Sequence, residues 1–337
     1  MDDMQTHTQS GGTQGEPTGA GSAPVRSYLC SLVIPTKNGG DLFRRVIAGL
    51  QQQTCWNDVE FIVVDSQSGD KTVEIARAAG AKCFVIPAAD FNHGATRDFA
   101  IAQASSNRVV LMVQDAIPYD PHMIAHLVAA LDEDLVAGVY ARQIPQPDAD
   151  VITKRNLNMH LTGRLNRDIC VMPSPQAYAA LRPMEKYSFC NFDNVCSALR
   201  KDVWQMENFG RISFGEDIDW SERVLKRGYK IVYEPAAAVI HSHDRPMGYE
   251  YRRTYVCHRK LYQQFGVQVT PTLRTAIHGW LHWTLRDMLY IARTEKRLGT
   301  KIEMILKTPM LNLLRIVGQF QAVRDEKAGT MRFIRGV

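Results

Sequence analysis

The chain has 337 residues, of which 45% are hydrophobic and 22% charged, the composition of an ordinary globular protein. This length predicts two domains, or one large α/β domain with an appendage. No apolar run approaches the roughly 18 residues needed to cross a bilayer, so we expect no membrane-spanning segment. Residues 1–26 are rich in Gly, Ser, Thr and Gln, and we expect them to be disordered and to contain no signal peptide.

The net charge of +5 is unevenly distributed. Residues 245–337 contain 17 Lys or Arg against 6 Asp or Glu, a local net charge of +11. Nucleic acid could bind such a tail, but the aromatic and glycine pattern of the common nucleic-acid modules is absent, so a membrane surface is the better candidate. The seven cysteines form no CxxC pair. This argues against a zinc site or a disulfide framework and favours a reducing cytoplasm.

Apolar runs alternate with amphipathic stretches from residue 29 onward. The runs are continuous and rich in β-branched residues, which is typical of buried strands, and the stretches between them have helical periodicity. This alternation indicates right-handed βαβ units and a mostly parallel sheet flanked by helices, an α/β fold. The predicted strands are 29–34, 60–65, 82–87 and 108–114, and the predicted helices are 41–53, 71–79 and 92–103.

Carboxylates stand where two of these strands end. The run 108–114 leads into Asp115, and the second strand ends at Asp65. Open α/β sheets bind ligands at this edge, although Asp115 could instead cap the helix that begins near Pro121. No GxGxxG follows the first strand and no GxxxxGK[ST] occurs, which argues against a dinucleotide-binding Rossmann enzyme and a P-loop NTPase.

The second half of the chain is less regular. Residues 144–186 show no clear period and predict a lid, a binding loop or disorder, whereas 192–199 are strand-like. Glu216 and Asp217 open a helix that ends before Gly228, and they point about 100° apart on it. One can face a cleft while the other caps the helix or pairs with a basic group; acids in a first turn also suit the helix dipole alone.

His241 and His243 follow two short extended segments, 230–235 and 237–239. Residues two apart share one face of an extended chain, and beside acids these histidines could contact a metal or a phosphate. Beyond residue 249 the sequence is helical and amphipathic, with Pro309 as an expected kink. Its basic residues and tryptophans fit a surface on anionic lipid, and packing against the rest of the chain is the alternative.

Together these motifs resemble those of family-2 glycosyltransferases of the GT-A fold, and within that family the bacterial rhamnosyltransferases. The resemblance covers about residues 29–244. The segments that carry it are Val33-Ile-Pro-Thr-Lys-Asn38, Val63-Val-Asp-Ser-Gln-Ser68, Phe91-Asn-His-Gly-Ala-Thr-Arg97, Gln114-Asp-Ala116, Ala141-Arg-Gln143, Phe214-Gly-Glu-Asp217, Tyr233-Glu-Pro-Ala236 and His241-Ser-His243.

Composition predicts the disordered segment 1–26, the resemblance implies a GT-A domain at 27–247, and the amphipathic pattern predicts a helical region at 248–337 that could associate with a membrane. It implies that the turn after the first strand and the acid-Ser-x-Ser segment hold the base and ribose of a nucleotide sugar, and that Arg97 adds charge on the diphosphate. The donor-binding residues it predicts are Pro35, Thr36, Asn38, Asp65, Ser68, His93, Arg97, Gln114, Asp115 and Glu216.

The usual Asp-x-Asp of the family is replaced here by Gln114-Asp115-Ala116, which offers a single carboxylate. Asp115 with His241 or His243, diphosphate oxygens and water could hold Mg²⁺ or Mn²⁺. By the same resemblance, Asp217 is the general base of an inverting transferase. It would move L-rhamnose from dTDP-L-rhamnose onto a growing, lipid-linked surface glycan at the inner face of the cytoplasmic membrane. An inactive nucleotide-sugar-binding relative and a sugar nucleotidyltransferase stay open as alternatives.

Overall fold

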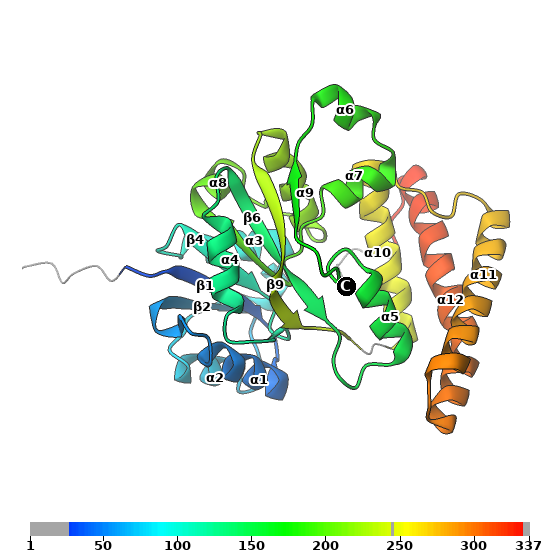
Figure 1. Cartoon of the computed structure of the whole chain (residues 1–337), viewed down its shortest axis with the longest axis horizontal. Coiled ribbons are helices and arrows are strands. Elements are labelled where there is room, and N and C mark those ends of the chain that lie inside the picture. Colours follow the sequence, from blue (N-terminus) through cyan, green and yellow to red (C-terminus); the bar gives the residue numbers. More distant parts are fainter. Residues whose placement is uncertain (1–26, 244–245, 333–337) are drawn as a thin grey trace, which may run out of the picture.

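The computed structural model describes residues 27–243 and 246–332, so the segment predicted to be disordered, 1–26, lies outside the described residues. One sheet forms the centre, in the order β3-β2-β1-β4-β8-β6-β9-β5, with β7 paired to β9 (Figure 1). The strands are β1 (Cys30–Thr36), β2 (Val59–Asp65), β3 (Lys82–Val85), β4 (Arg108–Met112), β5 (Ile117–Pro118), β6 (Val136–Ile144), β7 (Asp168–Val171), β8 (Cys196–Arg200) and β9 (Lys230–Ile240).

Most of these strands run in one direction. β1 to β4, β6 and β9 are parallel to one another, and β5, β7 and β8 run the opposite way. The predicted α/β architecture with a mostly parallel sheet is therefore confirmed. The helices are α1 (Gly40–Gln51), α2 (Thr72–Ala78), α3 (His93–Ala102), α4 (Met123–Leu131), α5 (Val151–Met159), α6 (Pro175–Ala180), α7 (Pro183–Phe189), α8 (Lys201–Met206), α9 (Glu216–Lys226), α10 (Met247–Phe265), α11 (Leu273–Thr294) and α12 (Leu298–Lys327).

The central strands are mostly apolar on both faces because helices cover both faces of the sheet. Leu32 of β1 packs into a core completed by α1 and α4, whereas its neighbour Val33 packs into a second core completed by α3 and α9. Side chains alternate between faces along a strand, so both positions need apolar residues. The parallel strands then end at one common edge, where Asp65 and Asp115 stand.

For residues 144–186 the sequence predicts a lid, a binding loop or disorder, and the structure shows that the region is neither disordered nor without secondary structure. This region contains α5, β7, α6 and α7. Asp150 and Ser174 cap α5 and α6 through hydrogen bonds to backbone N–H groups. Helical periodicity is weak in the sequence because these short helices bury little: α5 buries only Ile152 among its residues. Two further boundaries differ, since β8 begins only at Cys196 and the two predicted segments 230–239 form the single strand β9.

The C-terminal helices pack on one another and on the sheet domain (Figure 1). α12 contacts both α10 and α11 and continues through Pro309, where a kink was predicted. The hydroxyl of buried Tyr255 on α10 donates to Asp325 on α12 at 3.0 Å. Within the described part of the chain, we find no helix with both the length and the apolar character that a membrane crossing requires.

Candidate active site

Asp65, the last residue of β2, locks the turns after β1 and β2 together. Its buried carboxylate accepts hydrogen bonds from the hydroxyls of Thr36 (2.9 Å) and Ser68 (2.6 Å) and from the backbone N–H of Ser68 (2.7 Å). Asn38 adopts a left-handed conformation, with φ of 47°, and its side-chain oxygen accepts from the N–H of Gly69 at 2.8 Å. This network shapes the edge at which the sequence predicts a base and ribose site.

Gln114 ties the segment after β4 to the same turn. Its side-chain oxygen accepts from the N–H of Lys37 at 2.8 Å, and its side-chain nitrogen donates to the carbonyl of Lys37 at 3.0 Å. Asp115 therefore lies at the sheet edge beside the β1 turn. The N-cap of α4 is His122, and no side chain caps this helix by a hydrogen bond, so Asp115 does not have the alternative role of helix cap.

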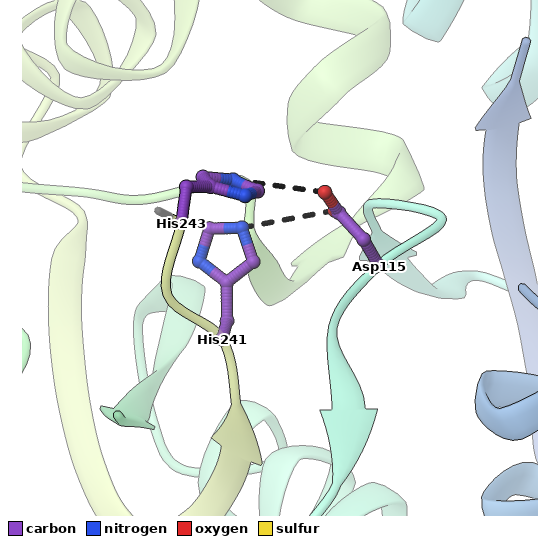
Figure 2. Close-up of side chains that lie close together, drawn as sticks. All are labelled: Asp115, His241 and His243. Carbon is purple, nitrogen blue, oxygen red and sulfur yellow. Dashed lines mark ion pairs between the residues drawn. The ribbon is translucent and has the colours of Figure 1, made fainter. Parts of the chain in front are cut away.

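Two histidines face Asp115 across this edge (Figure 2). His241 and His243 stand on the segment after β9, and their Nε2 atoms lie 3.7 and 3.6 Å from the two carboxylate oxygens of Asp115. One donor atom of each residue lies within 4.8 Å of the others. One oxygen and two imidazole nitrogens at these separations could hold a divalent transition-metal ion.

Gln143 orients one of these histidines. Its Nε2 donates to Asp193 at 2.8 Å and its Oε1 lies 3.0 Å from Nδ1 of His241. Because the carboxylate of Asp193 takes the amide hydrogen, we assign the amide oxygen to His241, whose proton must then be on Nδ1. Nε2 of the same ring faces Asp115. A metal-binding histidine needs this tautomer, and such partners commonly enforce it.

Glu216 forms a buried ion pair with Arg97. Oε1 of Glu216 lies 2.8 Å from Nη1 of Arg97, and the two side chains are only 6% and 7% exposed. The same guanidinium donates to the carbonyl of His93 at 3.2 Å, and burial followed by the charge of Arg97 lowers the pKa of His93. The pair fastens α3 to α9, so Glu216 is the acid of the pair that binds a basic group.

Asp217 turns to a different set of partners. Its carboxylate accepts from the backbone N–H groups of Ile218 (2.8 Å) and Asn194 (3.3 Å). Burial, followed by the charges of Glu216 and Asp193, raises the pKa of Asp217 to about 8. A carboxyl group that titrates near neutral pH is suited to accept a proton from a hydroxyl group.

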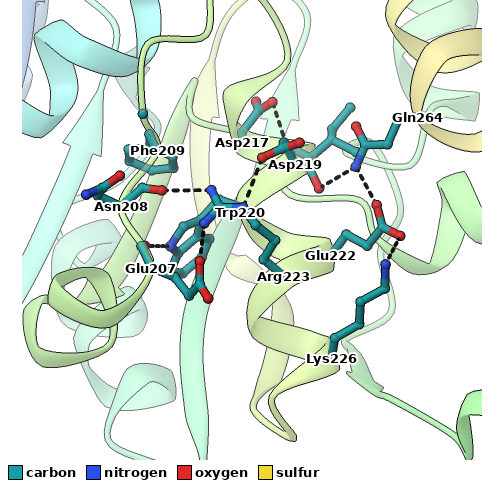
Figure 3. A network of polar contacts seen from close by, with 12 residues as sticks. Glu207, Asn208, Phe209, Asp217, Asp219, Trp220, Glu222, Arg223, Lys226 and Gln264 are labelled. Carbon is teal, nitrogen blue, oxygen red and sulfur yellow. Dashed lines mark hydrogen bonds and ion pairs between the residues drawn. The ribbon is translucent and has the colours of Figure 1, made fainter.

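A polar network holds α9, and with it Asp217, in place (Figure 3). The buried indole of Trp220 donates to the carbonyl of Glu207 at 2.7 Å, and Arg223 forms an ion pair with the Glu207 carboxylate. On the other side of the helix, Gln264 of α10 donates to the carboxylate of Glu222 at 2.8 Å. Helix α10 therefore helps to fix the helix that carries the candidate base.

A cavity of about 260 Å³ opens beside His241 and His243. Its walls come from β6, α5, α10, α12 and the segment before β8, where Asp193 lines it. Arg253 of α10 and Arg315 of α12 also line it, and Arg315 pairs with Glu250 at 3.1 Å. Asp217 is not part of the lining, and its carboxylate contacts Asn194, the residue after Asp193.

The structure places the predicted residues in three adjoining groups. The groups are Pro35, Thr36, Asn38, Asp65, Ser68 and Gln114 at the ends of β1, β2 and β4; Asp115, His241 and His243; and His93, Arg97, Glu216 and Asp217 at the starts of α3 and α9.

The sequence did not predict the supporting roles of Gln143 and Asp193, although Gln143 lies in a segment that resembles the family. It also did not predict that Arg253 of α10 and Arg315 of α12 line the cavity.

A mostly parallel sheet whose carboxyl edge combines a nucleotide-type turn, an Asp/His cluster and a first-turn acidic pair defines a GT-A glycosyltransferase. The chain belongs to Glycosyl transferase family 2, whose sequence pattern matches residues 31–205. The first half of the site, including Asp65, Asp115 and Asp193, lies inside this match.

Two relatives are O-antigen chain rhamnosyltransferases. RfbN from Salmonella typhimurium (strain LT2) is 30% identical over 231 residues, which cover 67% of this chain and 70% of RfbN. WbaN from Salmonella anatum is 28% identical over 250 residues, 70% of this chain and 75% of WbaN. Among solved structures, mannosyltransferase PcManGT from Pyrobaculum calidifontis, in complex with GDP-Man and Mn²⁺, has a TM-score of 0.57 at 15% identity, covering 94% of this chain and 92% of its own. That likeness supports the GT-A fold.

Proposed function

We propose that the protein is an inverting rhamnosyltransferase that moves L-rhamnose from dTDP-L-rhamnose to a hydroxyl group of a growing glycan. The observation that carries the proposal is the Asp115/His241/His243 cluster at the edge of a cavity lined by both histidines and by Asp193, with the raised-pKa carboxyl of Asp217 hydrogen-bonded to the next residue, Asn194. The names of the two relatives, both rhamnosyltransferases, support the choice of sugar.

The Asp/His cluster would hold a divalent cation. One carboxylate with two imidazoles suits Mn²⁺ better than Mg²⁺, which prefers oxygen ligands, and PcManGT was solved in complex with GDP-Man and Mn²⁺. A cation bound there would neutralise charge on the departing dTDP. The turn residues around Asp65 would bind the base and ribose, and the diphosphate would then lie between that turn and Asp115.

Asp217 would act on the acceptor. As the acceptor oxygen forms its bond to the anomeric carbon, the bond from that carbon to the diphosphate oxygen breaks and the hydroxyl proton passes to the Asp217 carboxylate. A single displacement of this kind inverts the anomeric configuration. The burial that raises the pKa of Asp217 makes it a stronger base than an exposed aspartate.

The acceptor would be lipid-linked, and the protein would lie on an anionic membrane at its cytoplasmic face. Two apolar side chains of α11, Leu281 and Leu285, are 56% and 62% exposed, and the same helix carries Arg274, Arg286 and Arg293. Apolar and basic side chains on one helical surface are typical of proteins that rest on anionic lipid.

The test is to incubate the protein and Mn²⁺ with dTDP-L-rhamnose, UDP-glucose and GDP-mannose in turn and to measure released nucleoside diphosphate. We expect release from dTDP-L-rhamnose, and loss of donor and Mn²⁺ binding in Asp115→Ala. Pyrophosphate as the product would identify a nucleotidyltransferase, binding with no turnover would identify an inactive relative, and release only from another donor would overturn the choice of rhamnose.

A further inference from the structure

A second hollow, of about 560 Å³, lies where α5 packs against α11. Its apolar surface comes from Met159 of α5 and from Leu285 and Leu289 of α11, which are 68%, 62% and 46% exposed. Leu285 and Leu289 are one helical turn apart and so lie side by side. A hollow with three large apolar side chains gathered in it is more than a scatter of surface leucines and indicates an apolar occupant.

Arginines border this apolar surface. Arg286 and Arg293 stand seven residues apart on α11, two turns along the same side, and Arg155 comes from α5. Asp287 holds Arg155 at 2.7 Å, and the guanidinium lies 4.8 Å from the centre of the Tyr290 ring. Nη1 of Arg155 has no hydrogen-bond partner among the described residues.

The charge balance of the hollow favours an anion. Among the described residues that line it, three are arginines and none is acidic. The nearby acid Asp287 is not part of the lining and is paired with Arg155 and Asn312. Guanidinium groups are well shaped for phosphate oxygens. The occupant that fits both properties is an apolar chain that ends in a phosphate or diphosphate.

Helix α5 separates this hollow from the active-site cavity. Thr153, Asn156 and Leu157 face the cavity, whereas Arg155 and Met159 of the same helix face the hollow. An α-helix with its side chains is about 10 Å wide, so one molecule could reach both places across α5.

We propose that the hollow between α5 and α11 binds the phosphate-bearing apolar chain of the acceptor, while the acceptor's sugar reaches across α5 into the cavity beside His241. The inference rests on the proposed function in so far as that function makes the acceptor lipid-linked. It assigns the acceptor's apolar chain to this hollow, in addition to any contact of α11 with a lipid surface.

The test measures binding of farnesyl diphosphate, a single isoprenoid chain with a diphosphate, below its micelle concentration and without metal. Leu285→Asp with Leu289→Asp should weaken binding at least roughly tenfold, since both lose apolar contact with the chain. Arg286→Glu with Arg293→Glu should weaken it to a similar extent. The matched control is Leu281→Asp, one turn earlier on α11, which is 56% exposed and does not line the hollow.

Full binding in Leu281→Asp, with loss of binding in the two double variants of the hollow, supports the proposal. Equal loss in Leu281→Asp, no binding to the wild-type protein, or displacement by an equal concentration of inorganic pyrophosphate each overturns it. Acceptor-independent release of dTDP from dTDP-L-rhamnose, measured in the same variants, should be unchanged. If the wild-type protein binds the probe but never releases dTDP, the proposed function is overturned and the proposed lipid site in the hollow is supported. If it releases dTDP but does not bind the probe, the proposed function is supported and the lipid site is overturned.

Discussion

The side-chain oxygen of Gln143 lies 3.0 Å from Nδ1 of His241, and this contact turns Nε2 of the ring toward Asp115. Gln143→Leu removes the contact while keeping a similar volume. We expect Mn²⁺ affinity, measured by titration calorimetry, to fall about 10–100-fold, the usual effect of losing such a supporting partner. Gln103→Leu, at an exposed position at the end of α3, is the control. Unchanged Mn²⁺ affinity in Gln143→Leu would show that His241 needs no orienting partner.

Two carboxylates near the cavity can be told apart by their variants. Asp217→Asn should lower kcat about 10²–10⁴-fold, since it removes the base, and leave the affinity for dTDP-L-rhamnose nearly intact. Asp193→Asn should instead weaken Mn²⁺ binding, because Asp193 orients Gln143 at 2.8 Å. Near-normal turnover in Asp217→Asn together with a large loss of kcat at saturating Mn²⁺ in Asp193→Asn would transfer the role of base to Asp193.

The raised pKa of Asp217 predicts how activity depends on pH. The base must be deprotonated to accept a proton, so kcat/KM should rise with pH through an apparent pKa near 8 and level off above it. The small residual rate of Asp217→Asn should lack this limb. A wild-type profile that is already level from pH 5 to 7 would contradict the titration of Asp217 in this range.

The same shift predicts an effect on stability. Unfolded aspartate titrates near a pKa of about 3.9, so between that value and about 8 the unfolded state binds fewer protons than the folded state. Stability from this group is therefore lost as pH rises across that window. Asp217→Asn should raise Tm by several degrees at pH 8 and make little difference below pH 4, as measured by thermal unfolding at both values.

The sequence predicts the acids and histidines of the site better than it predicts the residues that support them. Asp65 and Asp115 stand at strand ends, and any parallel sheet brings such ends to one edge. Gln143 and Asp193 are 50 residues apart and contact each other only because β6 and β8 are neighbours, an order that no local pattern encodes. The position of Arg315 in the cavity wall likewise depends on the packing of α12 on α10.

Membrane association is best tested with point variants, because α12 lines the cavity and deletion of the tail would disturb the site. Ile277→Asp with Leu281→Asp places charge on the exposed apolar surface of α11, where these residues are 52% and 56% exposed. We expect co-sedimentation with vesicles containing phosphatidylglycerol to fall at least about tenfold. Val85→Asp, on the distant edge strand β3 and 56% exposed, is the control. Equal vesicle binding by wild type and the α11 variant would remove this surface from the proposal.

The buried pair of Arg97 and Glu216 allows a test of what Arg97 does. Arg97→Met leaves the Glu216 charge buried and unpaired, so we expect a loss of about 3–5 kcal/mol in the free energy of unfolding, measured with urea. Arg97→Met with Glu216→Leu removes both charges and should recover most of that stability.

Donor affinity in the double variant then decides between two roles. Since the guanidinium of Arg97 is almost fully buried and already holds Glu216 and the His93 carbonyl, we expect it to position α3 against α9. Affinity for dTDP-L-rhamnose should therefore recover along with stability. The double variant could instead be stable and still bind the donor at least about tenfold more weakly. This result would place Arg97 on the diphosphate, as the resemblance to the family implies. The loss of affinity could then come only from the missing charge contact, because the fold would be intact.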